Sequence, residues 1–201
     1  MKIDSRLDAI RDIVRGKRVL DVGCVDHESS NELGQQWLHR VIGEQASELT
    51  GLDFEAEEVE KLNAKGYNII HGDAEVVDLG RTFDVIVAGE LIEHLGNPGN
   101  FLQNMRRHLE PGGMLVMTTP NPFYPKRFIE VMFEGKARVN GQHVSWFCPK
   151  TLAALMSRAG YTDIQVQPFN NSERWRAVVD RLSTFRPWFA TNLLATGINP
   201  L

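Results

Sequence analysis

The chain has 201 residues, of which 42% are hydrophobic and 24% are charged, a composition typical of a folded globular domain. This length suits one domain with a substantial core. The net charge of −4, from 22 basic and 26 acidic residues, argues against extended binding to nucleic acid, which needs a positive surface. We therefore expect no nucleic-acid partner.

Cysteine content and apolar runs bear on the compartment. Cys24 and Cys148 lie far apart and show no metal-binding spacing, which favours free thiols in a reducing, cytoplasmic setting. Residues 1–5 carry charges where a signal peptide needs an apolar core. No apolar run approaches the roughly 20 residues of a membrane-spanning helix. We expect a cytoplasmic protein without a membrane span.

The chain begins with a helix, a strand and a glycine turn. Apolar residues at helical spacing predict a helix from Ile3 to Val14, with Asp4 or Ser5 as its cap. The run 19–22 predicts a buried strand that stops at Gly23, and apolar residues from 33 to 42 predict the next helix. Such a turn lets the backbone approach a ligand, and the helix that follows offers free N–H groups.

The second strand, predicted over residues 48–53, ends in an acid. A carboxylate at the end of the strand next to the glycine turn suits the two hydroxyls of a ribose, which makes Asp53 a candidate ligand. A helix over Glu55–Lys65 follows, with Gly66 placed to end it. The third strand, 67–70, leads into Gly72-Asp73-Ala74. Together these features predict a cofactor that contains a nucleoside.

The rest of the chain continues to alternate strands and helices, which predicts an α/β fold with a mainly parallel sheet and helices on both faces. Pro98 and Pro149 stand where the first turns of two further helices are expected, and Gly160 where the second of these ends. The remaining strands are predicted over 83–88, 114–119, 163–168 and 191–196.

This ordered set of strand ends and turns resembles the class I S-adenosylmethionine-dependent methyltransferases, from about residue 17 to about residue 168. It is most similar to the small-molecule type, as in the ubiquinone pathway and in polysaccharide and natural-product pathways. The resemblance implies one domain over residues 1–201 with a Rossmann-like, doubly wound, seven-stranded sheet whose last strand is antiparallel. It also implies S-adenosyl-L-methionine as cofactor and a small-molecule acceptor.

The resemblance also assigns cofactor-binding positions. The family's loop usually reads Asp-x-Gly-x-Gly-x-Gly, but here Val25 and His27 occupy the later glycine positions, and their side chains limit how closely the backbone can approach a ligand. Asp21 falls near the methionine part of the cofactor, Asp53 at the ribose, and Asp73 with Ala74 at the adenine. The cofactor-binding set is Asp21, Gly23, Cys24, Asp53, Phe54, Asp73, Ala74 and Glu90.

Two histidines are candidates for catalysis. His94 ends the stretch Glu90-Leu91-Ile92-Glu93-His94, and three interpretations remain open: a base for a substrate hydroxyl, a structural hydrogen bond, or a divalent ion held with Glu90 and Glu93. His143 is a second base candidate or an anchor of a lid. We assign His94 and His143 as catalytic and assign no metal ligand.

Residues 120–148 do not follow the alternation of strands and helices seen in the rest of the chain. Three prolines, Pro120, Pro122 and Pro125, precede the apolar run 128–133, which predicts a helical turn or two. Long connections in compact domains are often lids or binding loops, and this one starts at the carboxyl end of a strand, where ligands of such sheets bind. We expect a mobile lid over the substrate; the alternative is a packed surface excursion.

The function expected from the sequence is methyl transfer from S-adenosylmethionine to a sugar or natural-product hydroxyl, with nitrogen as the second choice of acceptor atom. One alternative is an NAD-type oxidoreductase, which shares the glycine turn and the ribose acid but needs the later glycines for a pyrophosphate. Another is a methyltransferase-like binding domain without catalysis. A homodimer is possible through the aromatic residues Trp175, Phe185, Trp188 and Phe189.

Overall fold

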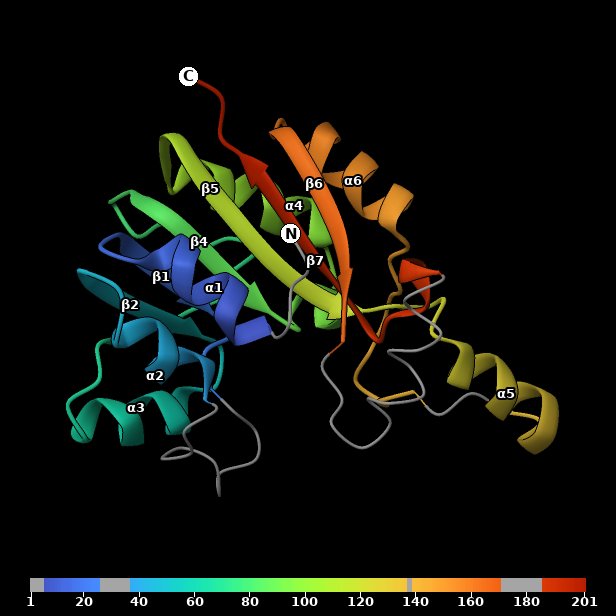
Figure 1. Cartoon of the computed structure of the whole chain (residues 1–201). Helices are drawn as coiled ribbons and strands as arrows, with labels where there is room; N and C mark the ends of the chain where they lie inside the picture. The colour runs from blue at the N-terminus through green and yellow to red at the C-terminus, as the bar shows by residue number, and fades with distance from the viewer. Residues whose placement is uncertain (1–5, 26–36, 137–138, 171–185) are drawn as a thin grey trace.

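The computed structural model describes residues 6–25, 37–136, 139–170 and 186–201, and these are built around a seven-stranded sheet (Figure 1). The strand order is β3-β2-β1-β4-β5-β7-β6, and β7 pairs antiparallel with both β5 and β6, whereas all the other pairs are parallel. This confirms the predicted sheet with its antiparallel last strand. The strands are β1 (Arg18–Val22), β2 (Glu48–Asp53), β3 (Ile69–His71), β4 (Phe83–Gly89), β5 (Leu109–Pro120), β6 (Thr162–Phe169) and β7 (Asn192–Ile198).

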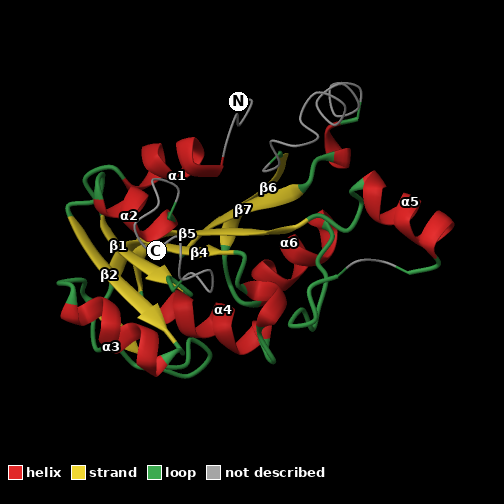
Figure 2. Cartoon of the chain, turned by 90° about the horizontal axis from the view of Figure 1, so that it is seen from below, coloured by secondary structure: helices red, strands yellow, loops and turns green. Residues whose placement is uncertain are grey.

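Helices cover both faces of the sheet (Figure 2). α1 and α2 pack on one face, and α4 and α6 pack on the other. None of the helices in the described ranges is both long enough and apolar enough to cross a membrane. The helices are α1 (Arg6–Val14), α2 (Leu38–Gly43), α3 (Ala56–Ala64), the short η1 (Ile92–His94), α4 (Pro98–Arg107), α5 (Pro125–Glu134), α6 (Pro149–Arg158) and the short η2 (Pro187–Phe189).

The core explains why the central strands read as continuous apolar runs. Successive side chains of a strand point to opposite faces, and here both faces are covered. Val19 of β1 belongs to the same buried cluster as Ile10 of α1, whereas its neighbour Leu20 belongs to the cluster on the other face, with Phe101 of α4 and Met156 of α6. All five are fully buried. Burying one such side chain stabilises the fold by about 1.5–3 kcal/mol.

Strand and helix bounds differ from the predictions in a few places. β5 begins at Leu109 rather than at residue 114, because the segment with Gly113 joins the strand; a Cβ at Gly113 would lie 2.9 Å from the carbonyl oxygen of Glu110. β3 starts two residues later than predicted, at Ile69. The proposed caps of the first helix and the start of the second, residues 4, 5 and 33, lie outside the described residues.

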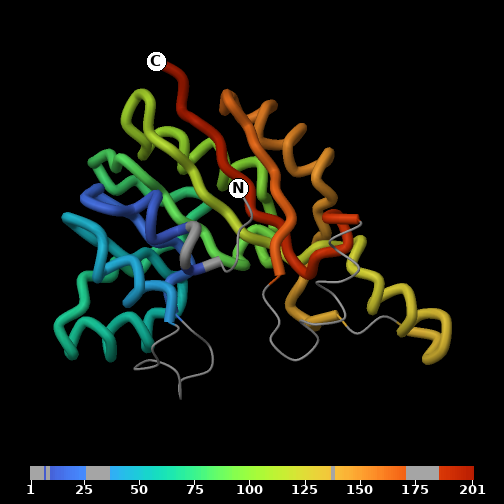
Figure 3. Tube along the Cα trace, in the orientation of Figure 1, coloured from blue at the N-terminus to red at the C-terminus, as the bar shows by residue number. Residues whose placement is uncertain are grey.

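The segment after β5 is fixed to the C-terminal part of the chain. β7 runs between β5 and β6 (Figure 3). The buried Asn121 donates hydrogen bonds from its side-chain amide to the carbonyl oxygens of Trp188 and Ala190, at 2.8 and 2.7 Å. α5 follows and covers the apolar run expected to be helical. Two side-chain hydrogen bonds therefore fix Asn121, at the start of the proposed lid, to the segment just before β7.

Candidate functional site

A pocket of about 700 Å³ opens at the carboxyl ends of β1, β2 and β4, where ligands bind in open α/β sheets. The structure brings every predicted cofactor-binding residue to this pocket, together with His94. His143 does not line it, although its neighbour Gln142 does. Residues that the sequence did not single out for the site include Trp37, Leu91, Leu95 and Gln142.

Gly23 is the one glycine that remains in the cofactor loop, and the structure explains why it is needed. Its φ of +70° lies in the left-handed region, which favours glycine. A Cβ there would lie 3.0 Å from Cδ1 of Leu91, another pocket residue. The Gly23 N–H donates to the carbonyl oxygen of Leu52 at 2.8 Å. The turn after β1 therefore packs closely against the loop after β4.

Val25, at the second glycine position, is held by the candidate ribose ligand. Its backbone N–H donates to Oδ2 of Asp53 at 2.8 Å, and the N–H of Glu55 donates to Oδ1 at 3.0 Å. The Val25 side chain is buried in a cluster with Trp37. Each carboxylate oxygen can accept more than one hydrogen bond, so these bonds leave room for ribose hydroxyls. His27 lies outside the described residues.

Asp21 has a buried partner that sequence reasoning missed. Its Oδ2 lies 2.9 Å from Nδ1 of His39 on α2, and both side chains are buried. Beside them, Nε1 of Trp37 donates to the carbonyl oxygen of Cys24 at 2.9 Å. Burial raises the pKa of the Cys24 thiol, which keeps it protonated and neutral at pH 7. The only signal in the sequence was a histidine among the apolar residues of a predicted helix.

The predicted adenine-binding residues form a turn. Oδ1 of Asp73 accepts a hydrogen bond from the N–H of Glu75 at 2.8 Å. Ala74 is buried, and its carbonyl oxygen accepts from the side-chain amide of Asn104 at 3.0 Å. Phe54 is 70% exposed on the lining of the pocket, which leaves its ring available to cover a bound ligand.

Glu90 has an unusual backbone conformation where β4 ends. Its φ of +54° is rare for a residue with a side chain, and such residues cluster at functional sites. Its N–H donates to the carbonyl oxygen of Thr118 at 3.0 Å. Its carboxylate accepts from the side-chain amide of Asn192 at 3.1 and 3.2 Å. The end of β4 is therefore tied to β5 and β7 beside the pocket.

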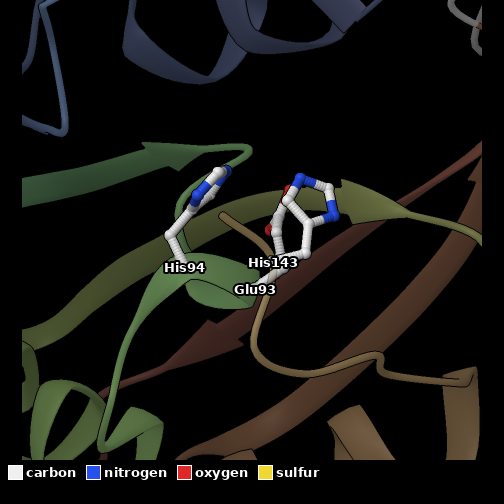
Figure 4. Close-up of side chains that lie close together, drawn as sticks. All are labelled: Glu93, His94 and His143. Carbon is white, nitrogen blue, oxygen red and sulfur yellow. The ribbon is translucent and has the colours of Figure 1, made fainter. Parts of the chain in front are cut away.

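His94 and His143 meet beside the pocket, with ring centroids 4.6 Å apart in an edge-on arrangement. His94 ends η1, and His143 lies in the segment that leads to α6; Figure 4 shows the two imidazoles together with Glu93. The backbone N–H groups of Val144 and Ser145 donate to the carbonyl oxygen of Glu93, at 2.9 and 3.3 Å. These two bonds hold His143 over η1.

Glu93 lies close to the two imidazoles and is 1% exposed. Its Oε2 accepts from the hydroxyl of Thr119 at 2.9 Å, whereas Oε1 has no hydrogen-bond partner among the described residues. Burial, and then the charge of Glu90, raise the pKa of Glu93 to about 8. A carboxyl in this position is mostly protonated at pH 7.

Burial, and then the neighbouring His94 and Arg127, lower the pKa of His143, so this imidazole is neutral at pH 7. Its Nδ1 is buried and has no hydrogen-bond partner among the described residues. One potential ligand atom from each of Glu93, His94 and His143 falls within 4.8 Å of the others, a grouping that could also surround a divalent ion. The structure thus groups Glu93 and His94 with His143, whereas the sequence suggested Glu90 as the third residue.

The charge of the pocket is strongly one-sided. Six carboxylates contribute to its lining, and no lysine or arginine does so among the described residues. Such a surface attracts cations and repels phosphate groups. The six acids are Asp21, Asp53, Glu55, Asp73, Glu75 and Glu90.

Comparison with known proteins identifies the family. Residues 2–166 match the family model described as "Methyltransferase domain". A ubiquinone biosynthesis O-methyltransferase of Schizosaccharomyces pombe is 32% identical over 57% of this chain and 44% of its own length. A tRNA U34 carboxymethyltransferase of Alteromonas mediterranea is 28% identical over 93% of this chain and 55% of its own length. The chain spans about half the length of the curated relatives it matches.

Solved structures share the fold. A methyltransferase dependent on S-adenosylmethionine from Archaeoglobus fulgidus has a TM-score of 0.70, with 18% identity over 96% of this chain and 91% of its own. An N-methyltransferase from Bradyrhizobium japonicum, solved with S-adenosyl-L-homocysteine, has a TM-score of 0.60, with 17% identity over 98% of this chain and 86% of its own. The family match and the fold together show that the chain belongs to the class I methyltransferases, whose cofactor is S-adenosyl-L-methionine.

Proposed function

We propose that this chain transfers a methyl group from S-adenosylmethionine to a hydroxyl of a small molecule, of the sugar or natural-product type. The observation that carries the proposal is a pocket lined by six carboxylates, with an imidazole on its lining. Carboxylates suit the positive sulfonium and ammonium groups of this cofactor, whereas they oppose the pyrophosphate of a nicotinamide dinucleotide. The charge of the site therefore favours a methyltransferase over an oxidoreductase.

The cofactor roles proposed for the pocket follow the order of the strands. Asp53 accepts hydrogen bonds from the ribose hydroxyls. The turn of Asp73 and Ala74 meets the adenine, and Phe54 covers it from the rim. Asp21 lies at the methionine part, next to the backbone of Gly23 and Cys24. Glu90 stands between the cofactor and the acceptor, beside His94 in the lining.

The reaction requires alignment and a place for one proton. The cofactor supplies a methyl group on a sulfonium, which is already a good leaving group. The acceptor oxygen forms a bond to the methyl carbon as the carbon–sulfur bond breaks and its electron pair passes to sulfur. The hydroxyl proton passes to Nδ1 or Nε2 of His94 or His143. A neutral imidazole can accept this proton, and the lowered pKa of His143 keeps it neutral at pH 7.

We further propose that residues 120–148 act as a lid. Support comes from Gln142, which lines the pocket, and from the contacts that place His143 against His94. Closure of such a segment excludes water during transfer. In the closed arrangement the lid would hold the second imidazole beside the acceptor.

The relatives support oxygen as the acceptor atom, because several of them are named O-methyltransferases. One relative is named for a tRNA substrate, but the net charge of −4 favours a small acceptor. Cys24 and Cys148 are both free, which fits a reducing, cytoplasmic setting.

Titration calorimetry with three ligands tests the proposal. We expect binding of S-adenosylmethionine and S-adenosylhomocysteine and no binding of NAD. Binding of NAD alone would support the oxidoreductase instead. Binding of none of the three would support a domain that has lost its cofactor.

A further inference from the structure

α5 presents its apolar side to solvent rather than to the protein. Glu130 is the residue of this helix that is buried, with 8% of its surface exposed. Apolar helix residues normally face the core and polar ones face water, so this arrangement is reversed. The exposed apolar residues of α5, here called the α5 stripe, are Phe128 (67% exposed), Ile129 (51%), Val131 (48%), Met132 (61%) and Phe133 (80%).

A cation–π contact joins the other side of α5 to the protein. Within the helix, the Lys126 ammonium lies 3.8 Å from the carboxylate of the buried Glu130. The Arg127 guanidinium stacks 4.8 Å above the ring of Trp146. α5 projects from the body of the molecule, away from the sheet (Figures 1 and 2), in agreement with the exposure of the stripe.

The α5 stripe is large enough to form the centre of a protein interface. A large aromatic side chain offers about 150–250 Å² of surface when it is fully exposed. Scaled by their exposed fractions, and with somewhat smaller areas for the three aliphatic side chains, the five residues of the stripe together offer on the order of 600 Å². Phe123, just before the helix, is a further 52% exposed. A stable interface buries about 800 Å² on each partner. A contiguous apolar surface of this size usually marks an interaction site.

We propose that the α5 stripe binds the α5 stripe of a second copy of this chain, with the two helices antiparallel about a twofold axis. A twofold interface must be complementary to itself. α5 meets this condition, because the half-exposed Lys126 lies at its N-terminal end and the exposed Glu134 at its C-terminal end, whereas Arg127 stacks on Trp146 of its own chain. In an antiparallel pair the basic end of each helix lies opposite the acidic end of the other.

The charges favour a second copy over a membrane surface. Helices that lie on membranes carry an excess of Lys and Arg on their polar face. In α5 two basic residues, Lys126 and Arg127, balance two acidic ones, Glu130 and Glu134, and the whole chain carries a net charge of −4. The proposed dimer joins the lid segments of two copies. It thus places the contact on α5, whereas the sequence suggested aromatic residues nearer the C-terminus.

Sedimentation equilibrium of the full chain across the micromolar range tests the proposal. We expect a dimer, and we expect Met132→Lys to raise its dissociation constant by about tenfold or more, because a charge would be buried in the contact. Val76→Lys is the matched control, since Val76 is 67% exposed on the loop after β3. A monomeric wild type, or a dimer that Met132→Lys leaves unchanged, would overturn the proposal.

A charge exchange identifies the orientation of the pair. Lys126→Glu and Glu134→Lys should each weaken the dimer, and an equimolar mixture of the two single variants should restore it as a mixed dimer, because the new opposite charges then lie on different chains. Failure of this rescue would overturn the antiparallel arrangement. A monomeric wild type that floats with phosphatidylglycerol vesicles, and loses this binding in Met132→Lys, would replace the second copy with a membrane.

Discussion

The Asp53 carboxylate accepts a hydrogen bond of 2.8 Å from the backbone N–H of Val25, so the proposed ribose ligand also holds the glycine-poor loop. In a loop with fewer glycines, side chains limit how closely the backbone can approach a ligand. Here the side chain of Val25 packs into a buried cluster. The same carboxylate accepts from Glu55, which begins the turn into α3. Cofactor binding and loop geometry are therefore coupled through one residue.

We predict that Asp53→Ala weakens binding of S-adenosylhomocysteine by roughly 1–3 kcal/mol, the scale for unpairing a charged hydrogen bond. Calorimetry gives the affinity, and circular dichroism checks that the fold survives. Asp53→Asn is the control, because an amide oxygen can still accept from Val25 and should retain part of the affinity. Equal affinity in wild type and Asp53→Ala would remove the ribose assignment.

We predict that removing the true base, His94 or His143, lowers turnover by roughly 10²–10⁴-fold while cofactor affinity changes little. The variants are His94→Ala and His143→Ala, assayed separately for turnover and for cofactor binding. Turnover in the wild type should rise with pH as the base becomes neutral. An unperturbed imidazole titrates near pH ~6.5, and the lowered pKa of His143 places its rise below that value. If both variants keep near-normal turnover, catalysis depends on alignment alone.

We predict that EDTA leaves turnover unchanged, because a base needs no ion. The control is the same assay with added Mg²⁺, Mn²⁺ or Zn²⁺. Loss of turnover with EDTA and its return with one of these ions would instead assign the cluster of Glu93, His94 and His143 to metal binding.

Glu93 should make stability depend on pH. Its pKa is raised from 4.5 to about 8, so between these values the folded state keeps a proton that the unfolded state has lost. The contribution of Glu93 to the free energy of unfolding is therefore fully present at low pH. It is lost as the pH rises towards 8, and the loss is on the order of a few kcal/mol. Glu93→Gln keeps an acceptor for Thr119 and cannot ionise.

Urea unfolding at about pH 5 and about pH 8 measures this effect. We expect Glu93→Gln to gain stability relative to wild type at the higher pH, while the exposed Glu60→Gln shows no such gain. A Glu93→Gln variant with the same pH slope as wild type would mean that Glu93 is ionised in the folded protein.

Hydrogen exchange tests the lid. The N–H groups of Val144 and Ser145 both donate to the carbonyl oxygen of Glu93, and opening of the lid would break these two bonds. In the protein with cofactor alone, we therefore expect fast exchange at both N–H groups. Both should slow when the acceptor binds, while β4 stays slow throughout. Slow exchange at both positions without acceptor would indicate a packed excursion rather than a lid.

The sequence was sufficient to predict the sheet and the cofactor-binding set that lines the pocket, but it missed Trp37 and Gln142 of the same lining. Asp53 and Glu90 end parallel strands, and the carboxyl ends of such strands meet at one edge of a sheet. Other features depend on how distant elements pack. The partner of Asp21 on α2, the burial of Glu93 and the outward stripe of α5 are each set by tertiary contacts, which no local pattern encodes.

The most direct test of the proposed reaction is to identify its product. The wild type would be incubated with S-adenosylmethionine labelled in its methyl group and with a panel of acceptors: a methyl glycoside, a catechol, a primary amine and tRNA. Mass spectrometry would locate the label. We predict a methyl ether on a small-molecule hydroxyl, formed in equal amount with S-adenosylhomocysteine. Label on tRNA or on an amine alone, or no transfer to any acceptor despite cofactor binding, would contradict the proposed function.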